Sequence, residues 1–238
     1  MEFKKEELPK HIAIIMDGNR RWARAKGMPV AFGHKEGAKV LEKIVRHANE
    51  IGLEYITVYA FSTENWKRDK EEVDYLMNLF ILMFKTKFKV IDKENIKVIF
   101  SGRREPLSKN VLDAMDSIVK KTENNTKGIL NICLNYGGQE EIIDGTKRII
   151  DDIINGKISK DDITKEKFYE YLYQDLPPID LLIRTSGEYR VSNFMLYQMS
   201  YSEFYFTNTL FPDFDENEFD KAIESFNHRD RRFGKNSK

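Results

Sequence analysis

Short continuous runs of apolar residues alternate along the chain with longer segments in which apolar residues recur at helical spacing. The continuous runs end in polar residues or glycine and are typical of strands buried on both faces. We expect strands at 12–16, 55–61, 96–100, 129–134, 180–183 and 205–207. We expect helices at 20–26, 36–51, 70–94, 108–123, 139–154, 165–173, 193–199 and 216–227. This alternation predicts a mostly parallel six-stranded sheet flanked by helices, in a single α/β domain over 1–238 with a frayed end at 1–10.

The segment 70–94 is unusual among the expected helices. Between 75 and 84 it is apolar on nearly every side, whereas a surface helix has one polar face. It is either buried between layers or at a subunit contact, or it lines an apolar cavity. The residues alone favour the first interpretation by about two to one, because an apolar stripe at helical spacing is usually core.

Composition excludes several classes of protein. The 238 residues contain 39 Lys and Arg and 39 Asp and Glu, so overall charge gives no indication of a nucleic-acid partner. The single cysteine, Cys133, excludes an internal disulfide and a multi-cysteine metal site. The charged first ten residues are no signal peptide, and the longest apolar stretch is too short to span a bilayer. We therefore expect a cytoplasmic protein whose membrane contact, if any, is peripheral.

Polar clusters follow four of the expected strands at their carboxyl ends. They are Asp17-Gly18-Asn19-Arg20-Arg21 and residues 62–68, 135–138 and 184–188. In a parallel α/β sheet these ends meet at one edge, where ligands bind. Arginine matches phosphate oxygens in bidentate fashion, and Mg²⁺ binds one or two carboxylates together with substrate phosphates. The residues alone therefore indicate a site for a phosphate or diphosphate ester with Mg²⁺.

Each of these residues also has a simpler interpretation. An Asp in a turn is more often a cap than a ligand, an Arg near a strand end is usually in a surface ion pair, and Trp66 is compatible with plain packing. The argument for a ligand site depends on the recurrence of such residues at one edge of the sheet. The chain has no Gly-x-x-x-x-Gly-Lys loop, no Gly-x-Gly-x-x-Gly after a strand and no Asp-Asp-x-x-Asp motif.

Several long motifs occur in order along nearly the whole chain. They are HIAIIMDGNRRWA at 11–23, GHKEG at 33–37, YAFSTENW at 59–66, NYGG at 135–138, DLLIRTSGE at 180–188 and FPDF at 211–214. Together they closely resemble the cis-prenyltransferase family, best known through undecaprenyl diphosphate synthase. So many long motifs in one order make a chance match or a different function on a shared fold improbable.

The resemblance implies a reaction. An allylic diphosphate such as farnesyl diphosphate would bind with its diphosphate over 18–21, and isopentenyl diphosphate would bind beside it. Each cycle would add a five-carbon unit with a new Z double bond, with Mg²⁺ as cofactor. The implied product is a long Z-polyprenyl diphosphate such as undecaprenyl diphosphate, the lipid-carrier precursor for cell-wall synthesis. The implied assembly is a homodimer.

The resemblance also implies roles for single residues. By matching positions, Asp17 is the catalytic acid and a metal ligand, Asn65 assists proton removal, and Glu203 is the second Mg²⁺ ligand. Asn65 is chemically awkward for that role, because an amide is neutral, and we expect it to position a water or the diphosphate. The implied substrate-binding set is Gly18, Asn19, Arg20, Arg21, Trp22, His34, Ser62, Thr63, Glu64, Trp66, Arg68, Arg184, Arg190, Val191 and Ser192, with Glu72 as a weaker candidate. The terminal Arg232-Phe233-Gly234 resembles a family end that reaches the partner's site in dimers.

The family places an apolar tunnel between the sheet and the helix at 70–94, with Ala60, Cys133 and Leu134 contributing from the strands. The resemblance thus reverses the preference for a plain core helix. Val30 departs from the family, because many relatives have an arginine there that grips the diphosphate.

Two smaller departures are Ser186, where Gly is common, and Tyr189, where bacterial members often have His. Two other functions stay open: a non-catalytic partner subunit, which would lack the catalytic Asp, and a Mg²⁺-dependent phosphate-ester hydrolase. The sequence leaves product length and the allylic starter unspecified.

Overall fold

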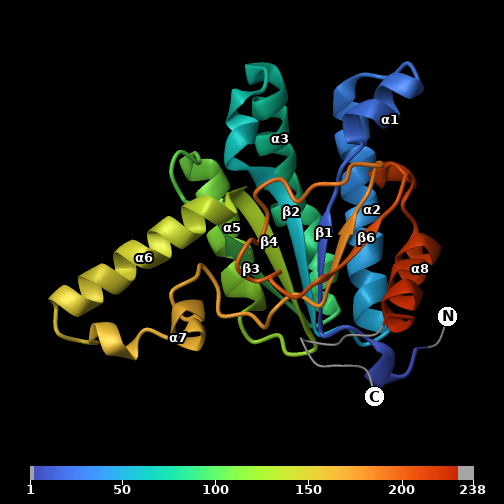
Figure 1. Ribbon diagram of the computed structural model, residues 1–238. Helices are drawn as coiled ribbons and strands as arrows, with labels where there is room; N and C mark the ends of the chain where they lie inside the picture. The colour runs from blue at the N-terminus through green and yellow to red at the C-terminus, as the bar shows by residue number, and fades with distance from the viewer. Residues whose placement is uncertain (1–2, 230–238) are drawn as a thin grey trace.

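The computed structural model describes residues 3–229, apart from the side chains of 87–90. Six strands form one sheet in the order β3-β4-β2-β1-β5-β6 (Figure 1), and every neighbouring pair is parallel. The strands are β1 (His11–Ile15), β2 (Tyr55–Ser62), β3 (Ile96–Ser101), β4 (Gly128–Tyr136), β5 (Leu181–Arg184) and β6 (Glu203–Phe206). The predicted α/β class and six strands are confirmed, and the sheet is parallel throughout.

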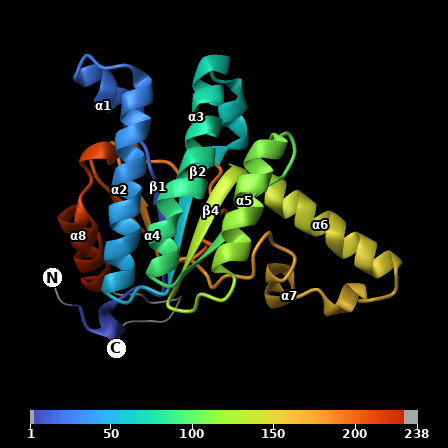
Figure 2. The ribbon, with the colours of Figure 1, turned by 180° about the vertical axis from the view of Figure 1, so that it is seen from behind.

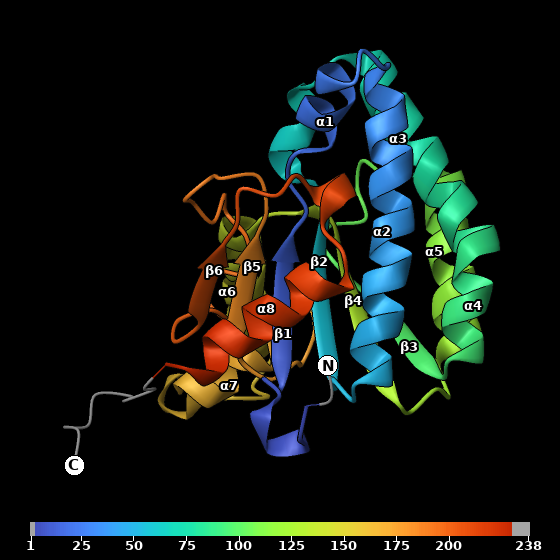
Figure 3. The same ribbon diagram turned by 90° about the vertical axis from the view of Figure 1, so that its right-hand side faces the viewer.

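Helices cover the two faces of the sheet unequally. One face carries five helices (Figures 2 and 3): α2 (Val30–Glu50), α3 (Lys70–Leu82), α4 (Phe88–Lys93), α5 (Lys109–Thr122) and α8 (Glu216–Asn227). The other face is covered by the segment 171–199 and the first turns of α6 (Gly138–Ile154), which then extends away from the sheet toward α7 (Lys165–Tyr169). The short α1 (Asn19–Ala25) stands beyond the carboxyl edge. No helix of the described chain is long and apolar enough to cross a membrane.

The alternation of side chains along β1 divides the core in two. Ile12 and Ile14 pack with the helices of the first face, whereas Ala13 and Ile15 pack with the segment 171–199. On the first face α8 is capped by Asp215, whose carboxylate accepts a hydrogen bond from Glu218 N at 2.9 Å. Both sides of each central strand are therefore buried, as the continuous apolar runs predicted.

A row of four buried polar side chains crosses the second face of the sheet. His11 Nε2 accepts from the Thr57 hydroxyl at 2.7 Å, because its Nδ1 donates to Pro177 O at 2.8 Å. Asn131 Nδ2 donates to Thr57 Oγ1 at 3.3 Å, and Ser101 Oγ donates to Asn131 Oδ1 at 3.0 Å. This polar row joins β1, β2, β4 and β3 in one chain of hydrogen bonds. Burial lowers the pKa of His11 to about 4, so the imidazole is neutral at neutral pH.

Four predicted helices differ from the structure. The helix expected at 36–51 already begins at Val30, and the long helix expected at 70–94 is broken by a π-helical turn at Met83–Lys87. The helix expected at 165–173 ends at Tyr169. The segment 193–199 is not helical but a series of turns. Ser192, Asn193 and Met195 have φ of 50°, 62° and 45°, which a right-handed helix does not allow.

Candidate active site

Asp17 follows β1 directly and is fixed by its own turn. Its backbone N donates to Thr185 Oγ1 at 3.0 Å, and the Thr185 hydroxyl donates to Asp17 O at 2.6 Å. Gly18 N donates to the carboxylate Oδ1 at 2.7 Å. Gly18 has φ +109°, a conformation that L side chains rarely adopt, and an added Cβ would lie 3.0 Å from Leu210. The turn therefore holds one carboxylate oxygen internally and presents the carboxylate, one-third exposed, at the carboxyl edge.

Arg184 ends β5 beside Asp17 and is almost fully buried. Its Nη2 donates to Asp17 Oδ2 at 2.9 Å, and its Nη1 donates to Ser192 Oγ at 2.8 Å and to the carbonyl of Arg190. Its Nε is buried and has no hydrogen-bond partner among the described residues. An unused donor on a buried guanidinium is costly. The rest of the guanidinium is held in place by Asp17, Ser192 and the carbonyl of Arg190.

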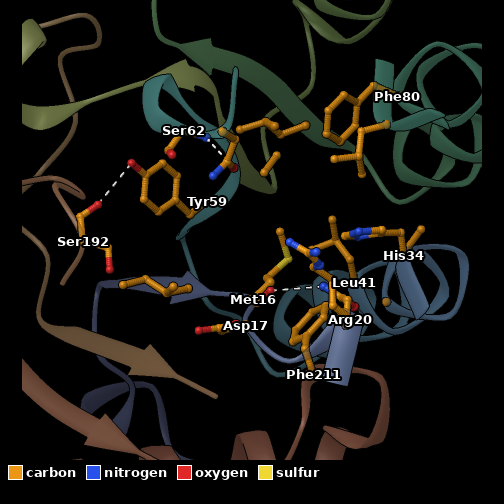
Figure 4. A pocket seen from close by; sticks show the side chains of 18 of the residues that line it. Met16, Asp17, Arg20, His34, Leu41, Tyr59, Ser62, Phe80, Ser192 and Phe211 are labelled. Atoms are coloured by element: carbon orange, nitrogen blue, oxygen red, sulfur yellow. Dashed lines mark hydrogen bonds between the residues drawn. The ribbon is translucent and has the colours of Figure 1, made fainter. Parts of the chain in front are cut away.

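A cavity of about 770 Å³ opens at this edge and has a polar and an apolar end. Figure 4 shows Asp17 between Arg20 and His34 on one side and Tyr59 and Ser192 on the other. The polar end is lined by Asp17, Asn19, Arg20, His34, Ser62, Glu64, Asn65, Arg68, Gln139, Arg184, Arg190, Ser192 and Asn193. The apolar end is lined by Leu76, Leu79, Phe80, Met83 and Phe84 from one side and by Ala60 and Ile132 from the sheet. The other apolar lining residues are Ile15, Met16, Ala38, Leu41 and Phe211, of which Met16, Leu41 and Phe211 lie beside Arg20 (Figure 4). One cavity thus suits a ligand with a charged head and an apolar tail.

The apolar wall bears on the predicted tunnel. α3 and the π-helical turn contribute five apolar residues to the lining, so this helix lines a cavity, as the resemblance implied. Ala60 lines it from β2. Cys133 does not, because alternation along β4 turns it to the opposite face, where its Sγ lies 3.7 Å from Met195 Sδ. Leu134, also expected in the wall, is buried in the core of the first face.

Glu72, whose side chain is only 10% exposed, lies against three basic side chains at the polar end of the cavity. Its Oε1 lies 3.1 Å from Arg68 Nη1 and 3.3 Å from His34 Nε2, and its Oε2 lies 3.6 Å from Arg20 Nη1. Burial lowers the pKa of His34, and the Glu72 carboxylate opposes this shift. Three basic side chains from α1, α2 and the turn before α3 thus converge on one carboxylate.

Two helices approach closely to make this convergence. A Cβ on Gly33 would lie 2.0 Å from Asn19 O, and one on Gly37 would lie 2.2 Å from Asn19 Oδ1. Only glycine therefore allows the start of α1 to rest on α2. This contact sets Arg20 beside His34, and it gives the GHKEG motif a structural reason.

Arg21 lies beside Asp17 but outside the cavity wall. Its Nη1 donates to Ser186 O at 2.9 Å, and its Nη2 lies 3.4 Å from Glu188 and 3.8 Å from Asp17. It therefore forms a second basic group next to the carboxylate, on the outer side of the turn.

Some of the predicted substrate-binding residues are packed away from the cavity. Trp22 Nε1 donates to Asp213 Oδ1 at 2.7 Å, and Trp66 Nε1 donates to Asn135 Oδ1 at 2.7 Å while its ring packs on Phe61. These tryptophans fix α1 and the turn after β2. Thr63 and Val191 also do not line the cavity.

Asn65 lines the cavity, and its side-chain oxygen already has a partner within the chain. Its Oδ1 accepts from Ser62 N at 3.1 Å and so caps the start of the short 3₁₀ helix Thr63–Lys67. The free NH₂ group is the part that remains for a ligand.

Glu203 does not join this set. It opens β6 and pairs with Leu181 at the start of β5, so it lies at the amino edge of the sheet, opposite Asp17. Its carboxylate accepts from Arg229 Nη1 at 2.8 Å. The expectation that Asp17 and Glu203 share one Mg²⁺ within a chain is therefore wrong. The terminal 232–234 motif lies outside the described residues.

Sequence reasoning missed Tyr59 and Asn193. Tyr59 OH donates to Tyr136 O at 3.2 Å and to Ser192 O at 3.3 Å, and burial raises the pKa of this phenol. Asn193 Nδ2 donates to Glu64 Oε1 and Glu140 Oε2, both at 3.1 Å. The signal available for Tyr59 was its position near the carboxyl end of the apolar strand expected at 55–61, where the edge of the sheet is close. Asn193 lay in a segment interpreted as helix.

Fold and site together define an α/β enzyme with an anion-binding edge that opens into an apolar cavity. A family model described as putative undecaprenyl diphosphate synthase matches residues 15–234. The chain belongs to this family and is a prenyltransferase, as its motifs predicted.

Relatives and solved structures agree over nearly the full length. An isoprenyl transferase of Fusobacterium nucleatum is 51% identical, with 97% of each chain covered. One of Thermotoga maritima is 47% identical, with 95% of this chain and 97% of the relative covered. Lavandulyl diphosphate synthase from Lavandula x intermedia, in complex with dimethylallyl diphosphate, superposes with TM-score 0.94 at 34% identity, over 97% of this chain and all of that one. A probable undecaprenyl diphosphate synthase from Campylobacter jejuni superposes with TM-score 0.80 at 31% identity, over 96% of this chain and 99% of that one.

Proposed function

We propose that the protein elongates prenyl chains in the cis configuration, condensing isopentenyl diphosphate units onto an allylic diphosphate such as farnesyl diphosphate. The observation that carries this proposal is the single cavity with arginines and Asp17 at one end and an apolar wall at the other. An apolar wall suits a growing hydrocarbon chain, and a basic mouth suits its diphosphate. We propose undecaprenyl diphosphate as the candidate product.

The allylic diphosphate is assigned to the region around Arg20, His34 and Arg68. These side chains already converge on the Glu72 carboxylate, so they suit a larger anion in the same place. The backbone N–H of Asn19 at the start of α1 adds a further donor, whereas that of Gly18 is already bonded to the Asp17 carboxylate. Negative charge that grows on the departing diphosphate would be stabilised there by groups that are already in place.

Isopentenyl diphosphate is assigned to Arg184, Arg190 and Ser192. This assignment is supported by the cavity lining, because all three residues line the cavity together with Asp17. The Ser192 hydroxyl is already bonded to Arg184 and fixes its direction. This places the second diphosphate on the β5 side of Asp17 and the first on the α1 side.

Mg²⁺ fits the site through Asp17 alone. The described residues contain no group of three or more His, Cys, Asp or Glu side chains that would hold a metal without substrate. Mg²⁺ is commonly bound by one or two carboxylates plus substrate phosphates, so Asp17 would hold it together with diphosphate oxygens. When bound, the ion would neutralise charge on the leaving diphosphate.

The proposed chemical step balances without any further reactant. The allylic C–O bond breaks and its electron pair leaves with the diphosphate. The double bond of isopentenyl diphosphate supplies the electrons of the new C–C bond. A proton then passes from the neighbouring carbon to an oxygen of the released diphosphate, and the electrons of that C–H bond form the new double bond. Asn65 is neutral, and its oxygen is bonded to Ser62 N, so we assign it to positioning rather than to accepting the proton.

Incubation with farnesyl diphosphate, radiolabelled isopentenyl diphosphate and Mg²⁺ tests the function. Label should become extractable into organic solvent, and chromatography of the dephosphorylated product against prenol standards gives the chain length. Release of diphosphate without lipid-extractable label would instead establish a hydrolase. Absence of both would favour the non-catalytic subunit.

Asp17→Asn tests the central carboxylate. It should abolish label transfer. Because the amide oxygen can accept from Gly18 N or from the buried Arg184 but not from both, the variant should also unfold at a lower temperature, and circular dichroism checks that it is folded under assay conditions. Asp74→Asn, on an exposed position of α3, is the matched control and should retain activity. Near-normal activity of Asp17→Asn would remove this residue from the mechanism.

A homodimer and a cytoplasmic location complete the proposal. α6 supports the first, because Ile143, Ile150 and Ile154 lie on one stripe of the helix and are 52%, 48% and 77% exposed. A second copy of this chain would cover them. Multi-angle light scattering of the parent and of Ile150→Lys decides this, with a monomeric parent as the contrary result.

A further inference from the structure

The loop between α1 and α2, with the residues that flank it, forms an exposed tip. We name residues 24–35 the α1–α2 tip. Met28 is 40% exposed and Phe32 is 45% exposed, and Pro29 between them is also exposed. Figure 3 shows this tip beyond the carboxyl edge of the sheet, at the end of the molecule where the cavity opens. Large apolar side chains at such an extremity are typical of a contact surface.

The α1–α2 tip and the residues just before it are strongly basic. Residues 18–35 contain Arg20, Arg21, Arg24, Lys26 and Lys35 but no Asp or Glu. The first two turn toward the site, and the last three are exposed. Among the described residues, none of these three forms an ion pair. The tip therefore presents positive charge that is not neutralised locally.

Charge and apolar surface are interleaved at the tip. Lys26 Nζ lies 4.0 Å from the centre of the Trp22 ring, and Lys35 Nζ lies 5.7 Å from the centre of the Phe32 ring. Each ammonium thus stands beside an aromatic ring rather than beside a carboxylate. This arrangement matches the boundary between phospholipid headgroups and acyl chains, where aromatic rings and lysines are both favoured.

The inner side of the same two helices lines the cavity. Asn19 and Arg20 come from α1, and His34, Gly37, Ala38 and Leu41 come from α2. A surface that held the outer side of the tip would therefore lie next to the cavity mouth. Across the mouth, the exposed Asp69, Glu71 and Asp74 at the start of α3 outnumber the exposed Lys67 and Lys70, so the positive surface is concentrated on the α1–α2 side.

We propose that the α1–α2 tip docks the enzyme on the surface of a bilayer that contains anionic phospholipids. Met28 and Phe32 enter the headgroup boundary, while Arg24, Lys26 and Lys35 lie at the lipid phosphates. The docked cavity mouth faces the bilayer, so that an apolar product passes into lipid without crossing water. The last point rests on the proposed function, whereas docking itself does not depend on a substrate.

Vesicle flotation of the full chain tests docking directly. We compare vesicles of phosphatidylcholine with vesicles of equal parts phosphatidylcholine and phosphatidylglycerol, at low and high salt. The protein should float with the mixed vesicles only, and high salt should reduce the bound fraction because it screens the charges. Failure to bind the mixed vesicles, or equal binding to both kinds, would overturn the proposal.

Matched variants locate the contact. Met28→Ser with Phe32→Ser should lower partitioning by an order of magnitude, and Lys26→Glu or Lys35→Glu should each lower it at least about fivefold. Ile163→Ser removes an apolar side chain of 40% exposure elsewhere, and Lys127→Glu reverses an exposed charge at the opposite end of the sheet. Equal losses in these controls would refute the tip as the site. Circular dichroism confirms that each variant is folded.

The two proposals fail separately. A chain that floats with anionic vesicles but transfers no label refutes the proposed function and leaves the docking surface in place. A chain that transfers label in buffer but does not float refutes docking alone. Met28→Ser with Phe32→Ser should keep the rate of the first condensation on farnesyl diphosphate, because neither residue lines the cavity.

Discussion

Replacing Glu72 by glutamine tests the assignment of the diphosphate site. The side chain keeps its shape and can still accept from Arg68, but the negative charge among Arg20, His34 and Arg68 is removed. In the ligand-free protein the carboxylate occupies the point on which these cations converge. An incoming diphosphate must compete with it. Glu72→Gln should therefore bind inorganic diphosphate more tightly than the parent.

The size of the gain follows from the geometry. At 3.1 and 3.6 Å from the two arginines, gross attraction is about 5 kcal/mol per pair at an effective dielectric constant of about 20. Arg20 is 41% exposed and Arg68 is 30% exposed, so solvent reduces each pair to a net value on the order of 1 kcal/mol. Relief of about 1–2 kcal/mol corresponds to about 5–30-fold in the dissociation constant.

Isothermal titration calorimetry with inorganic diphosphate measures this change. Glu71→Gln is the matched control, because it removes the same charge from the adjacent, exposed position of α3. The gain should be specific to position 72 and should shrink at high salt. Unchanged or weaker binding by Glu72→Gln, or an equal gain in Glu71→Gln, would refute the assignment of these cations to a diphosphate.

Three further predictions concern stability and product. Because the pKa of His11 is about 4 in the folded state and about 6.5 when unfolded, the free energy of unfolding should be highest above pH 6.5 and fall by about 2 kcal/mol between about pH 7 and pH 5. Urea titrations should show this slope in the parent, and a His11→Asn variant that kept the full slope would contradict it. Phe84→Ala enlarges the apolar end of the cavity, so thin-layer chromatography should show longer prenols, and an unchanged product would exclude Phe84 from length control. Phe219→Ala removes a fully buried ring of α8 and should cost about 3–5 kcal/mol in urea unfolding, whereas Asn217→Ala, at an exposed position of the same helix, should cost far less.

Much of the fold was predictable because local signals agreed with it. α8 occupies the predicted segment 216–227, since its apolar stripe and the cap at Asp215 mark the same start. β4 was predicted to end at Leu134, because Asn135 indicates a turn. The strand continues to Tyr136, since Asn135 is buried with its amide donating to Arg103 O and Glu105 O. Tertiary partners for a polar side chain are invisible to a pattern along the chain.

The candidate site was predictable to the extent that it lies at strand ends. The rule for carboxyl ends brought together Asp17, Arg68 and Arg184, which the structure also places at one cavity. It gave no place to Glu72, because acids in the first turn of a helix normally indicate only a helix start. The same rule opposed the role implied for Glu203, because the strand expected at 205–207 begins after this residue and therefore places it at the amino edge.

The buried polar row across the sheet also bears on how the strands find their alignment. Parallel strands made of continuous apolar runs give little preference for one register over the next. A slip of one residue would turn His11, Thr57, Asn131 or Ser101 onto the fully apolar face and leave its hydrogen bonds unmade. The row therefore penalises every misaligned sheet. Because the strand registers set where Asp17, Ser62 and Arg184 leave the sheet, the row also fixes the positions of these three residues relative to one another.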